Sequence, residues 1–135
     1  MKRRLITHSD YLRLNIIRDR TSLRSNKFDV LDQFYNELRA AAIYRPGHIS
    51  SNVVTMNSKV QLKDLKNGEE FQLTLTYPQH SKEEDRKVSI FHPIGMALLG
   101  RVERDEVPWR TKNGLRRFQI SKVVYQPEAA GDFYL

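Results

Sequence analysis

Two aspartates, Asp29 and Asp32, have a spacing that could support metal chemistry. They lie three residues apart, so on a helix they would share one face, and carboxylate oxygens are the ligands that Mg²⁺ prefers. They also fall in the first turns of a predicted helix, where the helix dipole favours Asp without any metal. The preceding Arg20, Arg24 and Lys27 are all basic. We favour the dipole explanation and predict no metal site.

The other residue types that carry chemistry show no catalytic pattern. The four histidines are scattered and lack a ligand motif such as His-Glu-x-x-His, and neither a glycine-rich phosphate loop nor a nucleophile elbow is present. The chain has no cysteine, which excludes disulfides and cysteine metal sites. We therefore predict no catalytic residue, no cofactor and no enzymatic activity. His92 directly precedes Pro93, and we expect it to cap the helix that starts there.

Charge is distributed unevenly along the 135 residues. The formal net charge is +7, of which residues 1–52 contribute +5 and residues 53–135 contribute +2. This field favours an acidic partner, either nucleic acid or an acidic protein surface, although it also suits a protein that only needs solubility. No run of ~18 apolar residues suggests a membrane span. Because a secretory signal is also missing, we expect a cytoplasmic protein.

The first fifty residues predict an antiparallel helical hairpin. Apolar residues recur at helical spacing over 9–20 and 28–42, and Pro46-Gly47 ends the second pattern. The polar connection between them is short, so the helices should lie side by side as a short coiled coil. At 1.5 Å per residue each helix would be about 18–24 Å long. The tip of this hairpin carries five charged residues: Asp19, Arg20, Arg24, Lys27 and Asp29.

Residues 53–135 predict a second domain built mainly from strands. Alternating apolar residues flank an Asn67-Gly68 turn and, later, an Asn113-Gly114 turn, which is the sequence pattern of β-hairpins. A short strand over 88–91 and a short helix over 93–99 lie between the two hairpins. Helices first and strands afterwards indicate an α+β fold. We expect the helix at 93–99 to cover the open face of a small antiparallel sheet.

Residues 92–100 read His-Pro-Ile-Gly-Met-Ala-Leu-Leu-Gly. This stretch resembles the Ser-Pro-(Ile/Leu)-Gly-x-Ala-Leu-(Leu/Ile)-Gly signature in the C-terminal domain of the GreA/GreB transcription elongation factors. The likeness runs from about residue 53 to 125 and includes Asp105-Glu106-Val107, while His92 and Arg104 replace the usual serine and glycine. The resemblance implies a fold like that of the FK506-binding proteins, in which a curved antiparallel sheet surrounds one short helix.

Two further stretches are similar to a shortened branch of the same superfamily, the regulators of nucleoside diphosphate kinase. They are Val-Val-Thr-Met-Asn-Ser at 53–58 and Tyr-Gln-Pro-Glu-Ala-Ala-Gly-Asp at 125–132. That branch also carries a short N-terminal helical hairpin, where the Gre factors carry a long one. The likeness of the N-terminal segment here rests on its length and pattern.

The resemblance implies a partner and the residues that meet it. The C-terminal domain of a Gre factor contacts RNA polymerase, and this role carries over to five positions of this chain: Pro93, Ile94, Gly95, Leu98 and Asp105. A Gre factor also passes a long coiled coil through the secondary channel of the polymerase. Two acidic residues at its tip help to hold the magnesium ion that assists RNA cleavage.

Helices of about 18–24 Å look too short to span such a channel. We therefore predict a monomeric transcription regulator that docks on RNA polymerase near the secondary channel without transcript cleavage. It would contact nucleic acid, if at all, within the transcription complex. The alternative is a basic nucleic-acid-binding or DNA-binding module that contacts phosphates through its N-terminal Arg and Lys residues.

Overall fold

The computed structural model describes residues 3–20, 30–111, 113–133 and 135. The N-terminal part contains β1 (Leu5–Thr7), α1 (His8–Arg20), α2 (Val30–Arg39) and β2 (Ala42–Tyr44). The rest contains β3 (Lys59–Asp64), β4 (Glu70–Thr76), β5 (Lys87–Ser89), α3 (Pro93–Leu98), β6 (Glu106–Thr111), β7 (Gly114–Tyr125) and α4 (Pro127–Ala130). The predicted α+β class is confirmed. No helix in the described ranges is long and apolar enough to cross a membrane.

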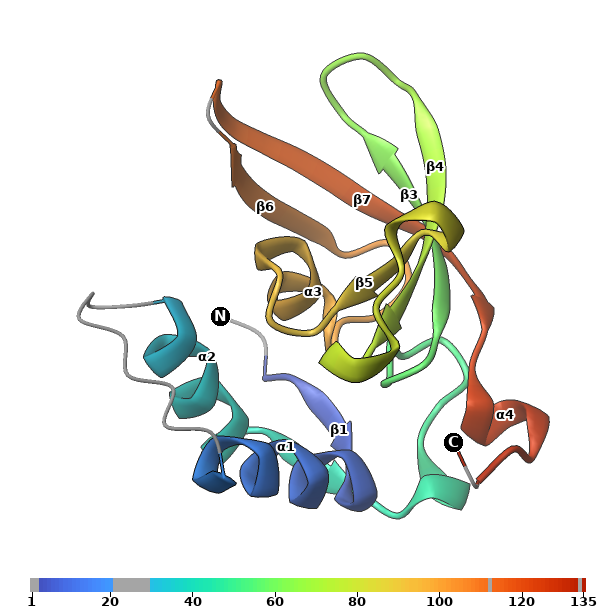
Figure 1. Ribbon diagram of the computed structural model, residues 1–135. Helices are drawn as coiled ribbons and strands as arrows, with labels where there is room; N and C mark the ends of the chain where they lie inside the picture. The colour runs from blue at the N-terminus through green and yellow to red at the C-terminus, as the bar shows by residue number, and fades with distance from the viewer. Residues whose placement is uncertain (1–2, 21–29, 112, 134) are drawn as a thin grey trace.

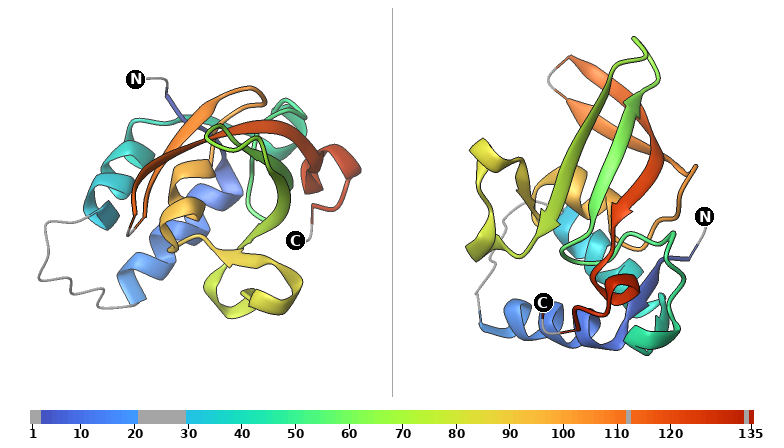
Figure 2. Two further views of the ribbon diagram at one scale, coloured as in Figure 1. Left: turned by 90° about the horizontal axis from the view of Figure 1, so that it is seen from above. Right: turned by 90° about the vertical axis from the view of Figure 1, so that its right-hand side faces the viewer.

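A curled sheet of five strands in the order β5-β4-β3-β7-β6 forms the larger layer (Figure 1). The central strand β3 pairs antiparallel with both β4 and β7, so Leu62 lies between Phe71 and Ile120. Its pairing with β7 shifts register twice, and such irregularities bend a sheet. The helix α3 packs against one face of the curled sheet, as the two views of Figure 2 show. The prediction that this helix covers the sheet is confirmed.

One strand departs from the antiparallel sheet that the sequence predicts. β5 pairs with β4 in parallel, with Leu75 opposite Val88. The two strands are joined by residues 77–86, which include two short 3-10 turns, Pro78–His80 and Glu83–Asp85. A connection of this length can carry the chain back to start a parallel strand, whereas a tight turn cannot. The polar sequence of 78–87 predicted a loop but not its direction.

The N-terminal part is also different from a pair of helices alone. We predicted a helix over 28–42, but α2 ends at Arg39 and residues 42–44 form β2, which pairs in parallel with β1. The Ala42 amide donates to the Arg4 carbonyl at 2.9 Å, so this strand is held by a distant segment that local periodicity does not register. α1 begins one residue earlier than predicted, and Thr7 Oγ1 caps it by accepting from the Asp10 amide at 3.1 Å.

A single core joins the two parts of the chain. Buried side chains of the sheet and α3, such as Leu62 and Leu98, belong to the same cluster as Leu14 of α1 and Phe34 of α2. The helices α1 and α2 contain 13 and 10 residues within the described ranges, which corresponds to about 20 and 15 Å. They lie below the sheet in Figure 1.

Candidate functional site

α3 has one end at the surface and one end buried against the N-terminal part. At the surface end, His92 Nδ1 accepts a hydrogen bond of 3.2 Å from the Ile94 amide, so the predicted capping role of His92 is confirmed. Pro93 occupies the first helical position, where its missing amide hydrogen costs nothing. Both His92 and Pro93 are exposed. The two residues before the buried part of the helix are therefore available to a partner.

A cleft of about 690 Å³ opens beside this end of the helix, and we call it the α3 cleft. Its apolar lining comes from Phe71, Leu73, Val88, Ile94 and Trp109, and its polar lining from Gln72, Ser81, Glu83, Arg86, Lys87, Ser89 and His92. The half-buried Trp109 ring lies between two others, with centroids 5.6 Å from His92 and 5.4 Å from Phe118. An apolar floor with a few polar groups at the edge is typical of a binding cleft.

The five residues predicted to contact a partner are not one surface. Pro93 is exposed, whereas Ile94, Gly95 and Leu98 are buried. A Cβ added at Gly95 would lie 2.4 Å from the Ser89 carbonyl oxygen, so this glycine allows α3 to approach the chain that precedes it. Burial assigns Gly95 and Leu98 to the packing of the helix, while contact of these positions with a partner stays a prediction. Ile94 reaches the floor of the α3 cleft, and the other two hold the helix in place.

Asp105 lies away from the α3 cleft. Its Oδ2 accepts a hydrogen bond of 3.0 Å from the Val102 amide, which closes a turn in which Arg104 has a φ of 77°. Asp105 lines a different groove, of about 470 Å³, together with Arg101 and Pro108. The structure gives Asp105 a role in its own turn and does not bring it together with Pro93.

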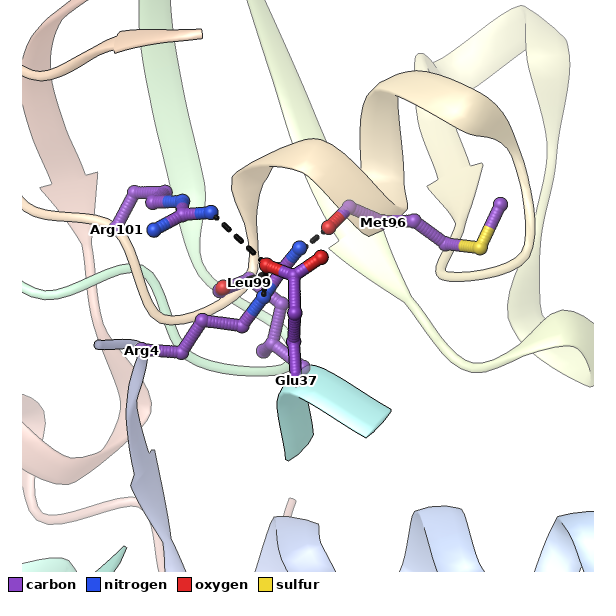
Figure 3. Close-up of polar contacts among 5 residues, drawn as sticks. All are labelled: Arg4, Glu37, Met96, Leu99 and Arg101. Atoms are coloured by element: carbon purple, nitrogen blue, oxygen red, sulfur yellow. Dashed lines mark hydrogen bonds and ion pairs between the residues drawn. The ribbon is translucent and has the colours of Figure 1, made fainter. Parts of the chain in front are cut away.

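The buried end of α3 is closed by a residue that the sequence did not single out. Arg4 is only 5% exposed, and its Nη1 donates to the carbonyl oxygens of Met96 at 2.5 Å and Leu99 at 2.8 Å (Figure 3). Its Nε is 3.3 Å from Glu37 Oε1, and Arg101 Nη2 lies 3.4 Å from the same oxygen. We call these three side chains and two carbonyls the Arg4 cluster. It joins the start of β1, α2 and α3.

The surroundings of Arg4 lower its pKa overall. Burial lowers the pKa of Arg4, and the neighbouring Arg101 lowers it further, while Glu37 opposes both. A guanidinium remains charged even so, and the helix carbonyls that it binds lack partners within the helix. A cation at a helix C-terminus is also favoured by the helix dipole. Arg4 therefore supplies the C-terminal cap of α3 from 92 residues away.

Backbone packing brings Arg4 to this position. The Leu5 amide donates to the Gly100 carbonyl at 3.0 Å, so β1 lies directly against the end of α3. Gly100 has a φ of 80°, and a Cβ there would lie 2.7 Å from the Cβ of Arg4. Gly100 follows the helix in the left-handed conformation, which a glycine adopts without strain. Its second role, leaving room for β1, had no signal in the local sequence.

A second buried charge lies on the other side of β1. Asp10 is 4% exposed, and it accepts hydrogen bonds of 3.1 Å from the Tyr77 hydroxyl and from the Met56 amide. Burial raises the pKa of Asp10 to about 6, and the nearby Glu128 contributes to the increase. Burial also raises the pKa of Tyr77, with Asp10 adding to it, so this hydroxyl stays a donor. Asp10 thus connects α1 to the segments before β3 and after β4.

The predicted hairpin tip is only partly visible. Arg24, Lys27 and Asp29 lie outside the described residues, and Asp19 and Arg20 end α1 with side chains that are also outside them. Asp32 is exposed and pairs with Arg18, whose Nη2 lies 3.0 Å from its Oδ1. In the described part of the chain, no group of three or more His, Asp or Glu side chains is arranged to hold a metal ion.

Several cations of the basic N-terminal segment have internal partners. Arg4 is buried, Arg18 pairs with Asp32, and Arg13 Nη1 donates to the Leu135 carbonyl at 2.7 Å. Arg18 also stacks 4.5 Å from the centroid of the Tyr35 ring. Part of the positive charge of this segment therefore stabilises the fold. Fewer of its cations can bind phosphate groups than the sequence suggested.

Comparison with known proteins agrees with this architecture. The family described as "Transcription elongation factor, GreA/GreB, C-term" matches residues 49–125. The regulator of nucleoside diphosphate kinase of Escherichia coli (strain K12) is 36% identical over 107 residues, which cover 78% of this chain and 79% of that protein. Transcription elongation factor GreA of Clostridioides difficile (strain 630) is 35% identical over 88 residues, 65% of this chain and 55% of that one.

A solved structure extends the likeness to the N-terminal part. The prokaryotic transcription elongation factor GreA/GreB from Nitrosomonas europaea superposes with a TM-score of 0.78 at 36% identity, covering 93% of this chain and 100% of that chain. The match therefore includes α1 and α2 as well as the curled sheet. By its sequence and its fold, the chain belongs to the GreA/GreB family of transcription elongation factors.

Proposed function

We propose that this protein regulates transcription by binding RNA polymerase through the α3 cleft and the exposed His92-Pro93 step. The observation that supports the proposal most directly is the position of the cleft, about 690 Å³ in volume, at the surface end of the family's signature helix. Its apolar floor and half-buried Trp109 would accept an apolar side chain of the partner. The rim carries Glu83 together with Arg86 and Lys87, so it can pair with charges of either sign.

The site of docking is proposed to be near the entrance of the secondary channel. In the Gre factors, a long helical arm enters this channel while the C-terminal domain remains outside. The helices of this chain reach about 20 and 15 Å within the described ranges. An arm of this length would stay at the mouth, where it would exclude a factor with a longer arm.

Docking is proposed to occur without transcript cleavage. Cleavage in this family needs a magnesium ion held by acidic residues at the tip of a long arm. Here Asp32 is engaged with Arg18, and an ion pair of this kind competes with metal binding for the carboxylate. The short helices support the same conclusion. In an assay on backtracked complexes we expect no magnesium-dependent cleavage above background, and cleavage that disappears in Asp29→Ala would contradict us.

The main test is retention on purified core RNA polymerase in competition with full-length GreA, at two salt concentrations. We expect retention that GreA displaces and that a rim variant, Lys87→Glu, weakens by about tenfold. Lys63→Glu is the matched control, because Lys63 is also exposed but lies on β3, outside the α3 cleft. Equal losses of retention in both variants would overturn the proposal. Retention that depends on bound nucleic acid and disappears at high salt would also overturn it. Either result would favour a basic nucleic-acid-binding module.

A further inference from the structure

The Arg4 cluster lies between the helix that borders the proposed docking cleft and the helical part of the chain. We propose that Arg4 is a positioning residue that sets the direction of α2 relative to α3. A partner seated in the α3 cleft would then meet the helices α1 and α2 in one orientation. The consequence for the partner rests on the proposed function, whereas the positioning role belongs to the free protein and is tested separately.

The hydrogen bonds of Arg4 select a single arrangement. The guanidinium is planar, and its donors point in fixed directions. One nitrogen binds the carbonyls of Met96 and Leu99 on α3, and another faces Glu37 on α2 (Figure 3). These bonds can form together only when α2 and the end of α3 have one relative position. Apolar contacts of α2 give no such direction, because the hydrophobic effect is non-directional.

Burial makes alternative arrangements costly. Arg4 is 5% exposed, and a buried charge without partners is strongly unfavourable. Arg4 and Arg101 both pair with the same oxygen of Glu37. If α2 rotated away from α3, Glu37 would leave both of these cations. The two cations would then face each other without the carboxylate between them. The orientation seen here is therefore the one that the charges favour.

A second attachment prevents the helical part from pivoting about Arg4 alone. Asp10, in the first turn of α1, binds the Met56 amide and the Tyr77 hydroxyl. Arg4 and Asp10 lie just outside the two ends of β1, and each is held by residues of the C-terminal part. One attachment permits rotation in any direction, whereas two separated attachments leave only rotation about the line that joins them. The bond from the Leu5 amide to the Gly100 carbonyl restricts that rotation as well. We infer that the α1–α2 pair is already oriented before any partner binds.

Distance measurement between spin labels tests this inference in the free protein. The chain has no cysteine, so Val30→Cys on α2 and Leu115→Cys on β7 can be labelled without background, and these side chains are 60% and 56% exposed. We expect a single narrow distance distribution in the parent. Arg4→Met should broaden it by about twofold or more while the circular dichroism spectrum stays the same, because the directional bonds are lost.

Three further variants keep the test decisive. Arg39→Met is the matched control, since Arg39 is an exposed arginine at the end of α2. Among the pairs described it bonds only with Asn36, and its substitution should leave the distribution narrow. Arg4→Lys should give an intermediate width, because an ammonium can bind the carbonyls but lacks the planar fork. Should Arg4→Met fail to fold, Glu37→Gln removes the charge on α2 and should broaden the distribution. A distribution as narrow as the parent's in each folded cluster variant overturns the positioning role.

Competition on the polymerase separates positioning from simple loss of stability. We expect Arg4→Met to keep the parent's retention on core polymerase within about twofold, because the α3 cleft is intact, but to exclude GreA about tenfold less well. A parallel loss of retention and exclusion would show that Arg4 only supports the fold, and would overturn the proposal. If the parent itself is not retained, the proposed function fails while the distance measurement still decides the positioning role.

Discussion

The Tyr77 hydroxyl donates a hydrogen bond of 3.1 Å to Asp10, which joins the residue after β4 to the first turn of α1. The second oxygen of Asp10 binds the Met56 amide, so one carboxylate holds two separate segments of the C-terminal part. Arg4 holds the end of α3 in the same way but with the opposite charge. A short strand of three residues is thus fastened on both sides by buried charged groups.

The raised pKa of Asp10 predicts how stability changes with pH. The folded-state pKa is about 6 and the ordinary pKa of an aspartate side chain is 3.8, so the folded state binds this proton more tightly than the unfolded state does. The stabilisation from this proton is complete below the lower value and is lost as the pH rises through about 6. From this group alone, we expect the free energy of unfolding to fall by roughly 2 kcal/mol between pH 4 and pH 7.

Asp10→Asn isolates that contribution. The amide cannot titrate, and it loses one acceptor, which costs about 1–3 kcal/mol. We expect the destabilisation caused by the substitution, measured by urea unfolding, to be larger at pH 4 than at pH 7, because only the parent loses stability over this range. Other carboxyl groups titrate in both proteins and cancel in the comparison. A destabilisation that increases with pH would contradict the raised pKa of Asp10.

Gly100 should be far less tolerant of alanine than another glycine with the same backbone conformation. Gly100 and Gly68 have φ values of 80° and 75°, so alanine is strained at both, at about 1 kcal/mol or more. At Gly68 a Cβ meets nothing within 4 Å, whereas at Gly100 it meets the Cβ of Arg4 at 2.7 Å. We expect Gly100→Ala to cost about 2 kcal/mol more than Gly68→Ala in denaturant unfolding. Equal costs would show that β1 can move away from the end of α3.

Much of the sheet part could be predicted because its signals are local. The Asn67-Gly68 turn, the alternation around Leu62 and the Pro93 helix start each specify structure within a few residues, and all three are found. The β1–β2 pair was missed because three-residue strands are too short to show a period, and their pairing joins residues 37 positions apart. The division into segments 1–50 and 53–135 stays a prediction.

The candidate site was only partly predictable for the same physical reason. The family signature located α3 correctly, but a signature does not say which of its residues face a partner and which face the core, and the structure shows that Ile94, Gly95 and Leu98 are buried. Arg4 had no signal at all, because an arginine near the N-terminus of a basic chain looks like one more surface charge. Its partners are distant in sequence, and only the folded backbone reveals them.

His92 should respond differently to two small substitutions. Its Nδ1 caps α3 by accepting from the Ile94 amide, and alanine cannot replace that acceptor. We expect His92→Ala to cost about 1 kcal/mol in unfolding free energy and His92→Ser to recover most of it, because a serine hydroxyl is a better cap. Thermal or urea unfolding of the pair measures this directly. If serine is no better than alanine, the His92 contact does not stabilise the helix.

Removing residues 1–48 should destabilise the sheet part severely, even though the remaining fragment contains the whole region that matches the family. The truncated chain would lose Arg4 from the carbonyls of Met96 and Leu99, and Asp10 from the Met56 amide. It would also expose core side chains that now pack against Leu14 and Phe34. Each newly exposed large apolar side chain costs about 1.5–3 kcal/mol, and typical domains have only about 5–15 kcal/mol in total.

We expect the fragment 49–135 to show either no cooperative unfolding transition or a midpoint far below that of the full chain. Circular dichroism with urea checks this, and adding the separate peptide 1–48 provides a control. If the fragment is unstable because it lacks the contacts of Arg4 and Asp10, the peptide should restore part of its stability, and a peptide carrying Arg4→Met and Asp10→Asn should not. A fragment that unfolds with the midpoint of the full chain would contradict this prediction. It would mean that the N-terminal helices do not stabilise the sheet part.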